Sequence, residues 1–257
     1  MPADTISWIN NYLKRINFHG KTPVGLRTLI NLHEHHVFSV PFENIDIYLK
    51  RKIYLKRGDI YAKVVESHRG GFCYELNFIF SELLHELGFD TRIISCRIIN
   101  DGVAGQEFDH MAVVVSINNT KYLADVGFGE LFVQPVILKV QNIQFDGRNF
   151  FKVEYGSSAG EFVLHMSDDG SDFKQIYSLN TMERRIEDFV SACDDKQTNP
   201  ASYFVNNTIC TLPTDTGRIT LFNDKFTETI DGEKASMEVV GDESIKKCLK
   251  EKFQIQI

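Results

Sequence analysis

The sequence predicts an α+β fold in which a helical N-terminal part, a strand-rich middle and a mixed C-terminal part follow one another. Apolar residues recur at helical spacing through the first part of the chain. From about residue 90 the pattern changes to short β-branched or aromatic runs between turns, which is typical of an antiparallel sandwich or barrel. We therefore expect three structural units, at residues 1–89, 90–195 and 196–257.

The helices expected in the first unit each have a start or stop signal. Asp4 provides a cap for the first helix, and Pro23 is expected in the opening turn of the second. A short third helix is expected over residues 59–65. The last begins near Cys73, and Gly88 is its expected C-terminal cap. These helices form the predicted N-terminal bundle.

The second unit is expected to be an antiparallel meander followed by a helix over residues 182–193. The predicted strands are rich in β-branched or aromatic residues and cover residues 91–98, 111–117, 121–126, 149–155, 160–166 and 173–178. In the third unit, strands are expected at 218–222 and 225–230, before a final helix at about 242–253.

The composition excludes several classes of function. A net charge of −7 argues against a nucleic-acid partner, because phosphate binding requires a basic excess. The 5 cysteines include no C-x-x-C pair, and the H-E-H-H run at residues 33–36 differs from the metalloprotease pattern H-E-x-x-H, so no metal is expected. The chain opens without a basic start and apolar run, and it contains no membrane-length apolar stretch. We expect a reduced, cytoplasmic protein without a membrane partner.

Cys73 is the strongest candidate for chemistry. It follows the Gly70-Gly71 pair at the expected start of a helix, where the glycines permit a tight turn. The unpaired N–H groups and the partial positive charge of a helix N-terminus favour the nucleophilic thiolate over the thiol. The same N–H groups can stabilise an oxyanion during acyl transfer. A small buried helix residue is the alternative interpretation of this stretch.

A base and an orienting carboxylate are predicted from a hairpin further along the chain. His110 begins one strand and Asp125 ends the next, and Asn118-Asn119 between them suits the positive φ angles of a type I′ turn. A turn centred between these asparagines places residue 110 opposite 127, and one centred a residue earlier places it opposite 125. Either register brings the two side chains within hydrogen-bonding reach.

Each of these two residues alone is equally explained as a strand-end histidine or a turn carboxylate. Their joint spacing, however, favours a site, because a carboxylate beside an imidazole fixes its tautomer and stabilises its charged form. The sequence therefore predicts Cys73 as nucleophile, His110 as base and Asp125 as the group that orients the base.

Short segments around these residues resemble signatures of the arylamine N-acetyltransferase family. They are PFENI at 41–45, RGGFCYELN at 69–77, DHM at 109–111 and DVGFG at 125–129. Looser similarity extends into the C-terminal part, so the resemblance covers nearly the whole chain. It implies a helical bundle, an antiparallel β-barrel and a C-terminal α/β lid around a catalytic core like that of cysteine proteases and transglutaminases.

The resemblance also implies a reaction. Acetyl-CoA is the expected donor, and an arylamine, hydrazine or arylhydroxylamine is the expected acceptor. The cycle is ping-pong: Cys73 takes the acetyl group as a thioester, and the amine then removes it. His110 acts as base and acid and Asp125 as its partner. A cysteine hydrolase, an amide synthase with another acyl donor, or a catalytically silent binding protein remain the alternatives.

Further site residues are predicted around these three. Arg69 and Glu43 are expected to organise the site, with Arg69 paired to Glu43 or to Glu75. The backbone of Gly127, in a Gly-x-Gly turn, is expected to approach a ligand. The candidates for an aromatic substrate pocket are Phe38, Phe42, Phe72, Phe128 and Phe204. Core packing is the alternative for Phe38 and Phe42.

Overall fold

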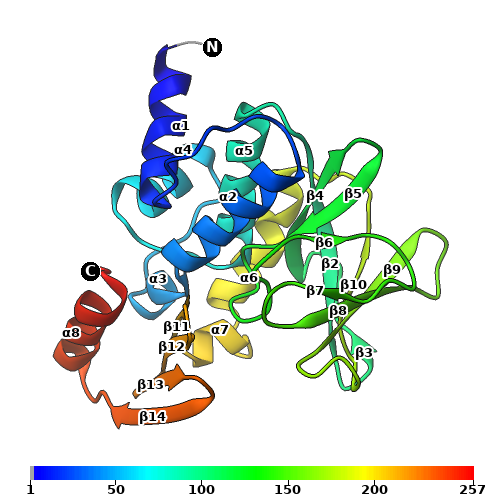
Figure 1. Ribbon diagram of the computed structural model, residues 1–257. Coiled ribbons are helices and arrows are strands. Elements are labelled where there is room, and N and C mark those ends of the chain that lie inside the picture. Colours follow the sequence, from blue (N-terminus) through cyan, green and yellow to red (C-terminus); the bar gives the residue numbers. More distant parts are fainter. Residues whose placement is uncertain (1–2) are drawn as a thin grey trace.

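The computed structural model describes residues 3–257 and confirms the predicted α+β class (Figure 1). Its helices are α1 Ala3–Arg15, α2 Leu26–Ser39, α3 Ile45–Tyr48, α4 Arg57–Tyr61, α5 Cys73–Glu86, α6 Val190–Thr198, α7 Tyr203–Asn206 and α8 Asp242–Phe253, with a π-helical turn at Ala62–Glu66 and a 3₁₀ turn at Ile186–Phe189. Within the described range, no helix has the length and apolar character needed to cross a membrane.

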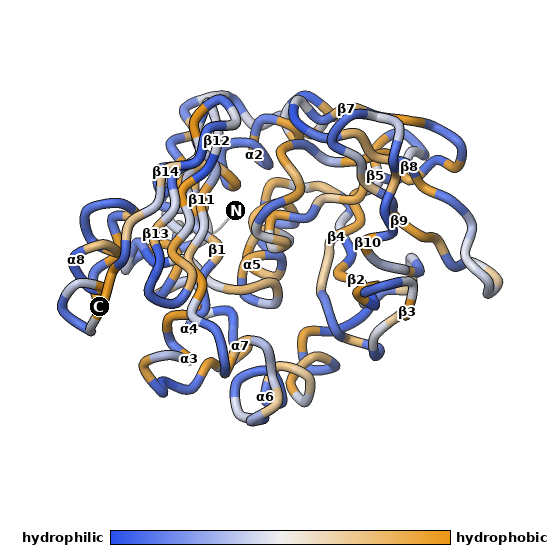
Figure 2. The backbone as a smooth tube through the Cα atoms, turned by 90° about the horizontal axis from the view of Figure 1, so that it is seen from below, coloured by the Kyte–Doolittle hydropathy of each residue, from blue (hydrophilic) through white to orange (hydrophobic). Residues whose placement is uncertain are grey.

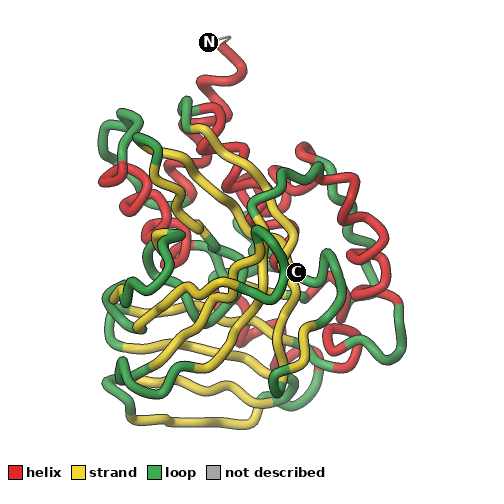
Figure 3. Tube along the Cα trace, turned by 90° about the vertical axis from the view of Figure 1, so that its right-hand side faces the viewer, coloured by secondary structure: helices red, strands yellow, loops and turns green. Residues whose placement is uncertain are grey.

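The strands form two separate antiparallel sheets. The first strands are β1 Phe42–Glu43, β2 Asp90–Asn100, β3 Val103–Ala104, β4 His110–Ile117, β5 Thr120–Ala124, β6 Val136–Ile137 and β7 Gln144–Phe145. The others are β8 Phe150–Tyr155, β9 Glu161–Ser167, β10 Lys174–Asn180, β11 Ile209–Thr214, β12 Gly217–Phe222, β13 Lys225–Ile230 and β14 Glu233–Glu238. The long strands lie side by side in Figure 3, apart from most of the helices.

Helix α5 is the centre of the N-terminal part because nearly all of its side chains are buried. Leu29 and Leu32 of α2 share its hydrophobic core with Leu83 of α5. The same core includes Met111 and Val113 from one face of β4. Figure 2 shows α5 between the barrel strands and the C-terminal sheet. The helix is thereby held rigidly, and so is Cys73 at its N-terminus.

The middle of the chain forms the near-closed barrel, with strand order β6-β5-β4-β2-β10-β9-β8-β7. Alternate residues of β4, such as Ala112 and Val114, face a second hydrophobic core together with residues of β8 and β9. The two edges approach each other where the Gln144 side chain bonds both the N–H and the C=O of Ile137, at 2.6 and 2.9 Å. Closing the sheet in this way removes exposed strand edges.

The β4–β5 turn confirms the register centred between the two asparagines. Asn118 and Asn119 have φ angles of 48° and 63°, and Ile117 pairs with Thr120. Continued along the strands, this register puts position 110 opposite 127, so His110 and Asp125 are diagonal neighbours. The local chemistry of the turn thus positions two of the predicted site residues.

The C-terminal sheet is built on a short N-terminal strand. Its order is β1-β11-β12-β13-β14, with Phe42 opposite Thr211. Asn44 strengthens this junction, because its Nδ2 donates to the carbonyls of Phe204 and Asn207 at 2.8 and 2.7 Å. Its Oδ1 accepts from the N–H of Ile209 at 2.7 Å. The last 50 residues or so are therefore anchored directly beside the helical part.

Some element predictions were wrong. Helix α2 begins at Leu26 rather than at Pro23. Residues 182–185 are not helical, because the Arg184 N–H bonds the carbonyl of Ile93 at 2.9 Å and holds this segment against β2. Strands β11 and β14 were also missed. The division into units at 89/90 and 195/196 stays a prediction, and α6 runs across the second boundary.

Candidate active site

The structure brings Cys73, His110 and Asp125 together. Cys73 is the first residue of α5, His110 the first of β4, and Asp125 directly follows β5. His110 Nε2 lies 2.7 Å from Asp125 Oδ2, which leaves Nδ1 available to Cys73, and the cysteine and histidine side chains line the same cavity. All three side chains are almost fully buried. The geometry is that of a thiol, an imidazole and a carboxylate in series.

Asp125 is held by donors from three directions. Its Oδ1 accepts from Asn77 Nδ2 at 2.9 Å and from the N–H of Gly127 at 3.0 Å, and its Oδ2 accepts from the Tyr177 hydroxyl at 3.1 Å. Burial disfavours the charged carboxylate, but the nearby His110 and these hydrogen bonds outweigh it and lower the pKa of Asp125. The carboxylate is therefore ionised and fixed in orientation.

Asn77 is a functional residue that the sequence reasoning did not assign. It lies one helical turn after Cys73, and its Nδ2 also donates to the carbonyl of Met111 at 2.6 Å. Its Oδ1 accepts from the N–H of Val126 at 2.9 Å. The i, i+4 spacing of Cys73 and Asn77 was the available signal, because such residues share a helix face. Asn77 thus ties the helix that carries the sulfur to the hairpin that carries the carboxylate.

His33 supports the same carboxylate through the backbone. Its Nε2 accepts from the N–H of Asp125 at 3.2 Å, and its Nδ1 donates to the carbonyl of Val133 at 2.9 Å, a tautomer assigned from this pattern. In the part of the chain that the structure describes, no group of three or more His, Cys, Asp or Glu side chains could hold a metal ion. The His33 side chain therefore helps to position the backbone of Asp125.

The charge state of His110 follows from its neighbours. Burial alone would lower its pKa, but the Asp125 carboxylate, its hydrogen bond to the imidazole and the neighbouring Cys73 raise the pKa of His110 to about 10. A histidine with a raised pKa keeps its proton as the pH rises through neutrality. At pH 7 the site accordingly contains an imidazolium that can stabilise a thiolate beside it.

We expect nitrogen NMR shifts to show His110 charged from pH 6 to about pH 9, and neutral only above about pH 10. His33 and His36 serve as internal controls, because burial lowers the pKa of both imidazoles and keeps them neutral at pH 7. A His110 resonance that is already neutral at pH 7 would contradict this charge assignment.

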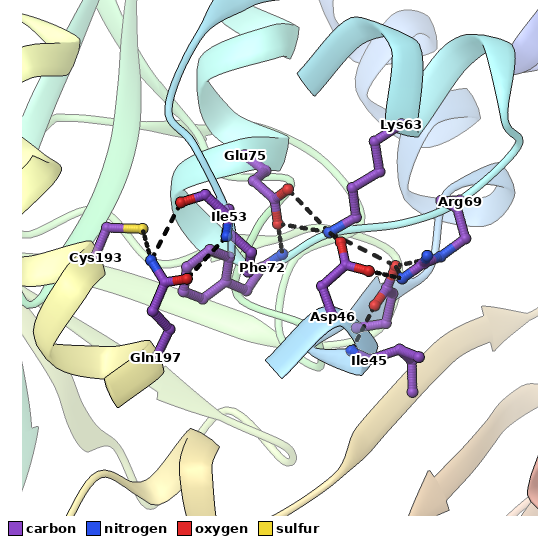
Figure 4. Close-up of polar contacts among 10 residues, drawn as sticks. Ile45, Asp46, Ile53, Lys63, Arg69, Phe72, Glu75, Cys193 and Gln197 are labelled. Atoms are coloured by element: carbon purple, nitrogen blue, oxygen red, sulfur yellow. Dashed lines mark hydrogen bonds and ion pairs between the residues drawn. The ribbon is translucent and has the colours of Figure 1, made fainter. Parts of the chain in front are cut away.

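Of the two partners expected for Arg69, Glu43 is the one that it binds in the structure. The Arg69 Nε and Nη2 both donate to Glu43 Oε1, at 3.0 and 2.8 Å, and Nη2 also lies 3.1 Å from Asp46 Oδ1 (Figure 4). The two guanidinium nitrogens thus share one carboxylate oxygen. Glu43 Oε2 is used instead by the N–H of Ile45 at 2.7 Å. The cluster joins β1 to the loop that leads into α5.

Glu75 pairs with a different cation, Lys63, which no local sequence pattern indicates. Lys63 Nζ lies 2.9 Å from Glu75 Oε1 and 2.8 Å from Asp46 Oδ2 (Figure 4). Glu75 Oε2 accepts from the N–H of Phe72 at 3.2 Å, which caps the N-terminus of α5. This buried network fixes the backbone on either side of Cys73.

A cavity of about 560 Å³ opens onto the sulfur and the imidazole. Its walls come from the loop after Asp125, from α6 and α7, and from both sheets, and they include Phe42, Cys73, His110, Gly127, Phe128, Gly129, Glu130, Leu131, Lys196, Tyr203, Phe204 and Thr211. The Phe128 ring lies edge-on to the His110 ring at 5.1 Å. The cavity therefore offers an aromatic wall next to the reacting groups.

Two of the predicted pocket residues do not line this cavity. Phe38 lies at a separate cavity, under the guanidinium of Arg148 at 5.1 Å, because the rotation of α2 directs it away from Cys73. Phe72 is fully buried and packs edge-on against Phe204 at 5.9 Å. Phe72 thus supports the wall from behind.

Gly127 is packed too tightly against the helix N-terminus for any side chain. A Cβ there would lie 2.7 Å from Asn77 Nδ2 and 2.9 Å from Cys73 Cα. We expect Gly127→Ala to cost about 1–3 kcal/mol in the free energy of unfolding, measured by urea titration, and to reduce activity. Gly58→Ala is the matched control, since no atom lies within 4 Å of its added Cβ. Equal stability of the two variants would refute the close contact.

Comparison with known proteins supports a single family. A family model described as N-acetyltransferase matches residues 25–257. The chain is 31% identical to the pineal gland isozyme NAT-3 of Gallus gallus arylamine N-acetyltransferase, over 97% of this chain and 94% of that protein. It is 30% identical to the Escherichia coli arylamine N-acetyltransferase, over 87% and 80%. The solved structure of the Mycobacterium marinum enzyme in complex with CoA has the same fold, with a TM-score of 0.85 at 24% identity over 96% and 92% of the two chains. The chain belongs to the arylamine N-acetyltransferase family.

Proposed function

We propose that this protein transfers the acetyl group of acetyl-CoA to the nitrogen of an arylamine, a hydrazine or an arylhydroxylamine. The observation that carries the proposal is the buried set of Cys73, His110 and Asp125, in which Asp125 bonds His110 and the other two line the 560 Å³ cavity. The Mycobacterium marinum relative that binds CoA supports the choice of donor. Cys73 is the acetylated nucleophile, His110 the proton carrier and Asp125 the group that orients it.

In the first half-reaction, the Cys73 thiolate attacks the thioester carbonyl of acetyl-CoA. The unpaired N–H groups at the N-terminus of α5 stabilise the oxyanion that develops. The bond to the CoA sulfur then breaks, and the imidazolium of His110 supplies the proton for the leaving thiolate. Acetyl-Cys73 and neutral His110 remain after free CoA departs.

In the second half-reaction, the amine nitrogen attacks the carbonyl of acetyl-Cys73. Neutral His110 takes one proton from that nitrogen, and Cys73 leaves as a thiolate beside the regenerated imidazolium. The acetylated amine is released. Phe128 and Phe204, on the cavity wall, provide apolar surface on which an aryl ring packs, and they limit the access of water to the thioester.

The test is to follow CoA release from acetyl-CoA with and without an arylamine such as aniline or a hydrazine. We expect release to depend on the amine and to be matched by acetylated product. Equal release in the two conditions would identify a hydrolase, and no release would identify a silent binding protein. If another acyl donor reacted with a kcat/KM at least about tenfold higher than that of acetyl-CoA, the amide synthase would be favoured.

A further inference from the structure

Five consecutive residues, Gly127 to Leu131, form one wall of the reaction cavity. This wall loop has no regular secondary structure, and Gly129 within it has a φ of 84°. Its two ends are fixed by the barrel: the Gly127 N–H donates to Asp125, and the Leu131 carbonyl accepts from Asn149 Nδ2 at 2.8 Å. The carbonyls in its middle, those of Gly129 and Glu130, are instead bound from the C-terminal sheet.

Arg218, from β12 of the C-terminal sheet, holds the middle of the wall loop. Its Nη1 donates to the carbonyl of Gly129 at 2.6 Å, and its Nη2 donates to the carbonyl of Glu130 at 3.2 Å. For residues 3–257, no second donor to these two carbonyls is found. Nη1 also donates to Thr211 Oγ1 at 2.9 Å, which fixes the guanidinium at the edge of the cavity.

The position of the wall loop matters because it carries Phe128. The centre of that ring lies 5.1 Å from the centre of the His110 ring and 5.7 Å from that of the Tyr177 ring. The Tyr177 hydroxyl in turn donates a hydrogen bond to Asp125. A displacement of the loop would move an aromatic wall next to the reacting groups and widen the space around Cys73. Such a displacement would change how the acceptor fits and how easily water reaches Cys73 before it altered the hydrogen bond between His110 and Asp125.

We propose that Arg218 is a positioning residue that holds the wall loop, and that it thereby sets the fit of the acceptor against acetyl-Cys73 and keeps water from the thioester. The kinetic part of this proposal rests on the acetyl transfer proposed above. Arg218 acts through the backbone of Gly129 and Glu130, without touching the reacting atoms. Through Arg218, the C-terminal sheet then contributes to the shape of the acceptor site.

Arg148 provides a matched control for a purely structural role. It also bridges the barrel and the C-terminal sheet by donating to backbone carbonyls, those of Gly217 at 2.8 Å and Thr214. It makes no contact with the wall loop among the hydrogen bonds of the described residues. Loss of Arg148 weakens the attachment of the sheet, whereas loss of Arg218 also releases the loop.

The first test measures backbone ¹⁵N relaxation order parameters of residues 128–131 in the full chain. We expect them to fall from about 0.85 towards about 0.6 or below in Arg218→Met, to be intermediate in Arg218→Lys, and to stay near the wild-type values in Arg148→Met. Unchanged order parameters in Arg218→Met, or an equal fall in Arg148→Met, would overturn the proposal. Arg218→Lys keeps a cation in place and covers the case in which the methionine variant folds poorly.

The second test separates the two half-reactions. In Arg218→Lys we expect the KM for the arylamine to rise at least about fivefold and amine-independent CoA release to increase, while the rate of Cys73 acetylation changes less than about twofold. An unchanged KM with a lowered melting temperature would show a structural role only and would overturn the proposal. If the wild-type protein shows no amine-dependent release, the proposed function fails, and the relaxation measurement still decides whether Arg218 holds the loop.

Discussion

Replacing Cys73 with serine is expected to abolish the acetyl-enzyme and to lower amine acetylation by about 10⁴-fold or more. A serine hydroxyl keeps the shape of the site, but it is a far weaker acid than a thiol, so it cannot supply the thiolate nucleophile of the proposed mechanism. The measurement is the rate of acetylated amine formation at saturating acetyl-CoA, together with intact protein mass.

Cys193→Ser is the control for this experiment. Cys193 is also buried, and its sulfur accepts a weak hydrogen bond from Gln197 Nε2 at 3.6 Å, which a serine can replace. Burial raises the pKa of the Cys193 thiol, so this residue is not a competing nucleophile. We expect near-normal activity in Cys193→Ser. Activity retained in Cys73→Ser, or lost equally in both variants, would remove Cys73 from its assigned role.

Replacing Asp125 with asparagine is expected to lower the rate by about 10³–10⁴-fold while the fold is retained. The amide is neutral, so it no longer stabilises the His110 imidazolium, and one of its two ends is a donor. Three donors, from Asn77, Gly127 and Tyr177, now converge on the carboxylate. An amide cannot accept from all of them and from His110 Nε2, so the imidazole loses its fixed tautomer.

Tyr177→Phe separates the charge of Asp125 from one of its hydrogen bonds. It removes the 3.1 Å bond to Oδ2 and leaves the carboxylate in place. Because one hydrogen bond contributes about 1 kcal/mol, we expect a loss of about tenfold or less. The comparison uses single-turnover acetylation, with folding checked by thermal melting. A loss below about tenfold in Asp125→Asn would show that the carboxylate does not control the imidazole.

Local features made part of this site predictable. Asn118-Asn119 determines a hairpin register that brings His110 and Asp125 onto neighbouring positions, and turn chemistry of this kind is readable over a few residues. The Gly70-Gly71 pair likewise indicated where α5 begins. These signals depend only on neighbours in the chain, which explains why the three central side chains could be proposed without coordinates.

Long-range contacts were not predictable in the same way. Phe42 pairs with Thr211, and Lys63 bridges Glu75 and Asp46, because the fold brings distant segments together rather than because of any local pattern. The side that Phe38 faces depends on how α2 is rotated about its axis, which a mixed aromatic and histidine sequence does not determine. The roles of Asn77, Tyr177 and Arg218 also became visible only from their hydrogen bonds.

The most direct measurement is to incubate the wild-type protein with acetyl-CoA, determine the intact mass, and map the acetylated peptide before and after adding an arylamine. We predict one acetyl group, located on the peptide that contains Cys73, and its complete loss on addition of the amine, with one acetylated amine formed per group lost. An acetyl group on Cys96, Cys193, Cys210 or Cys248, or one on Cys73 that persists in the presence of the amine, would contradict the transfer through Cys73.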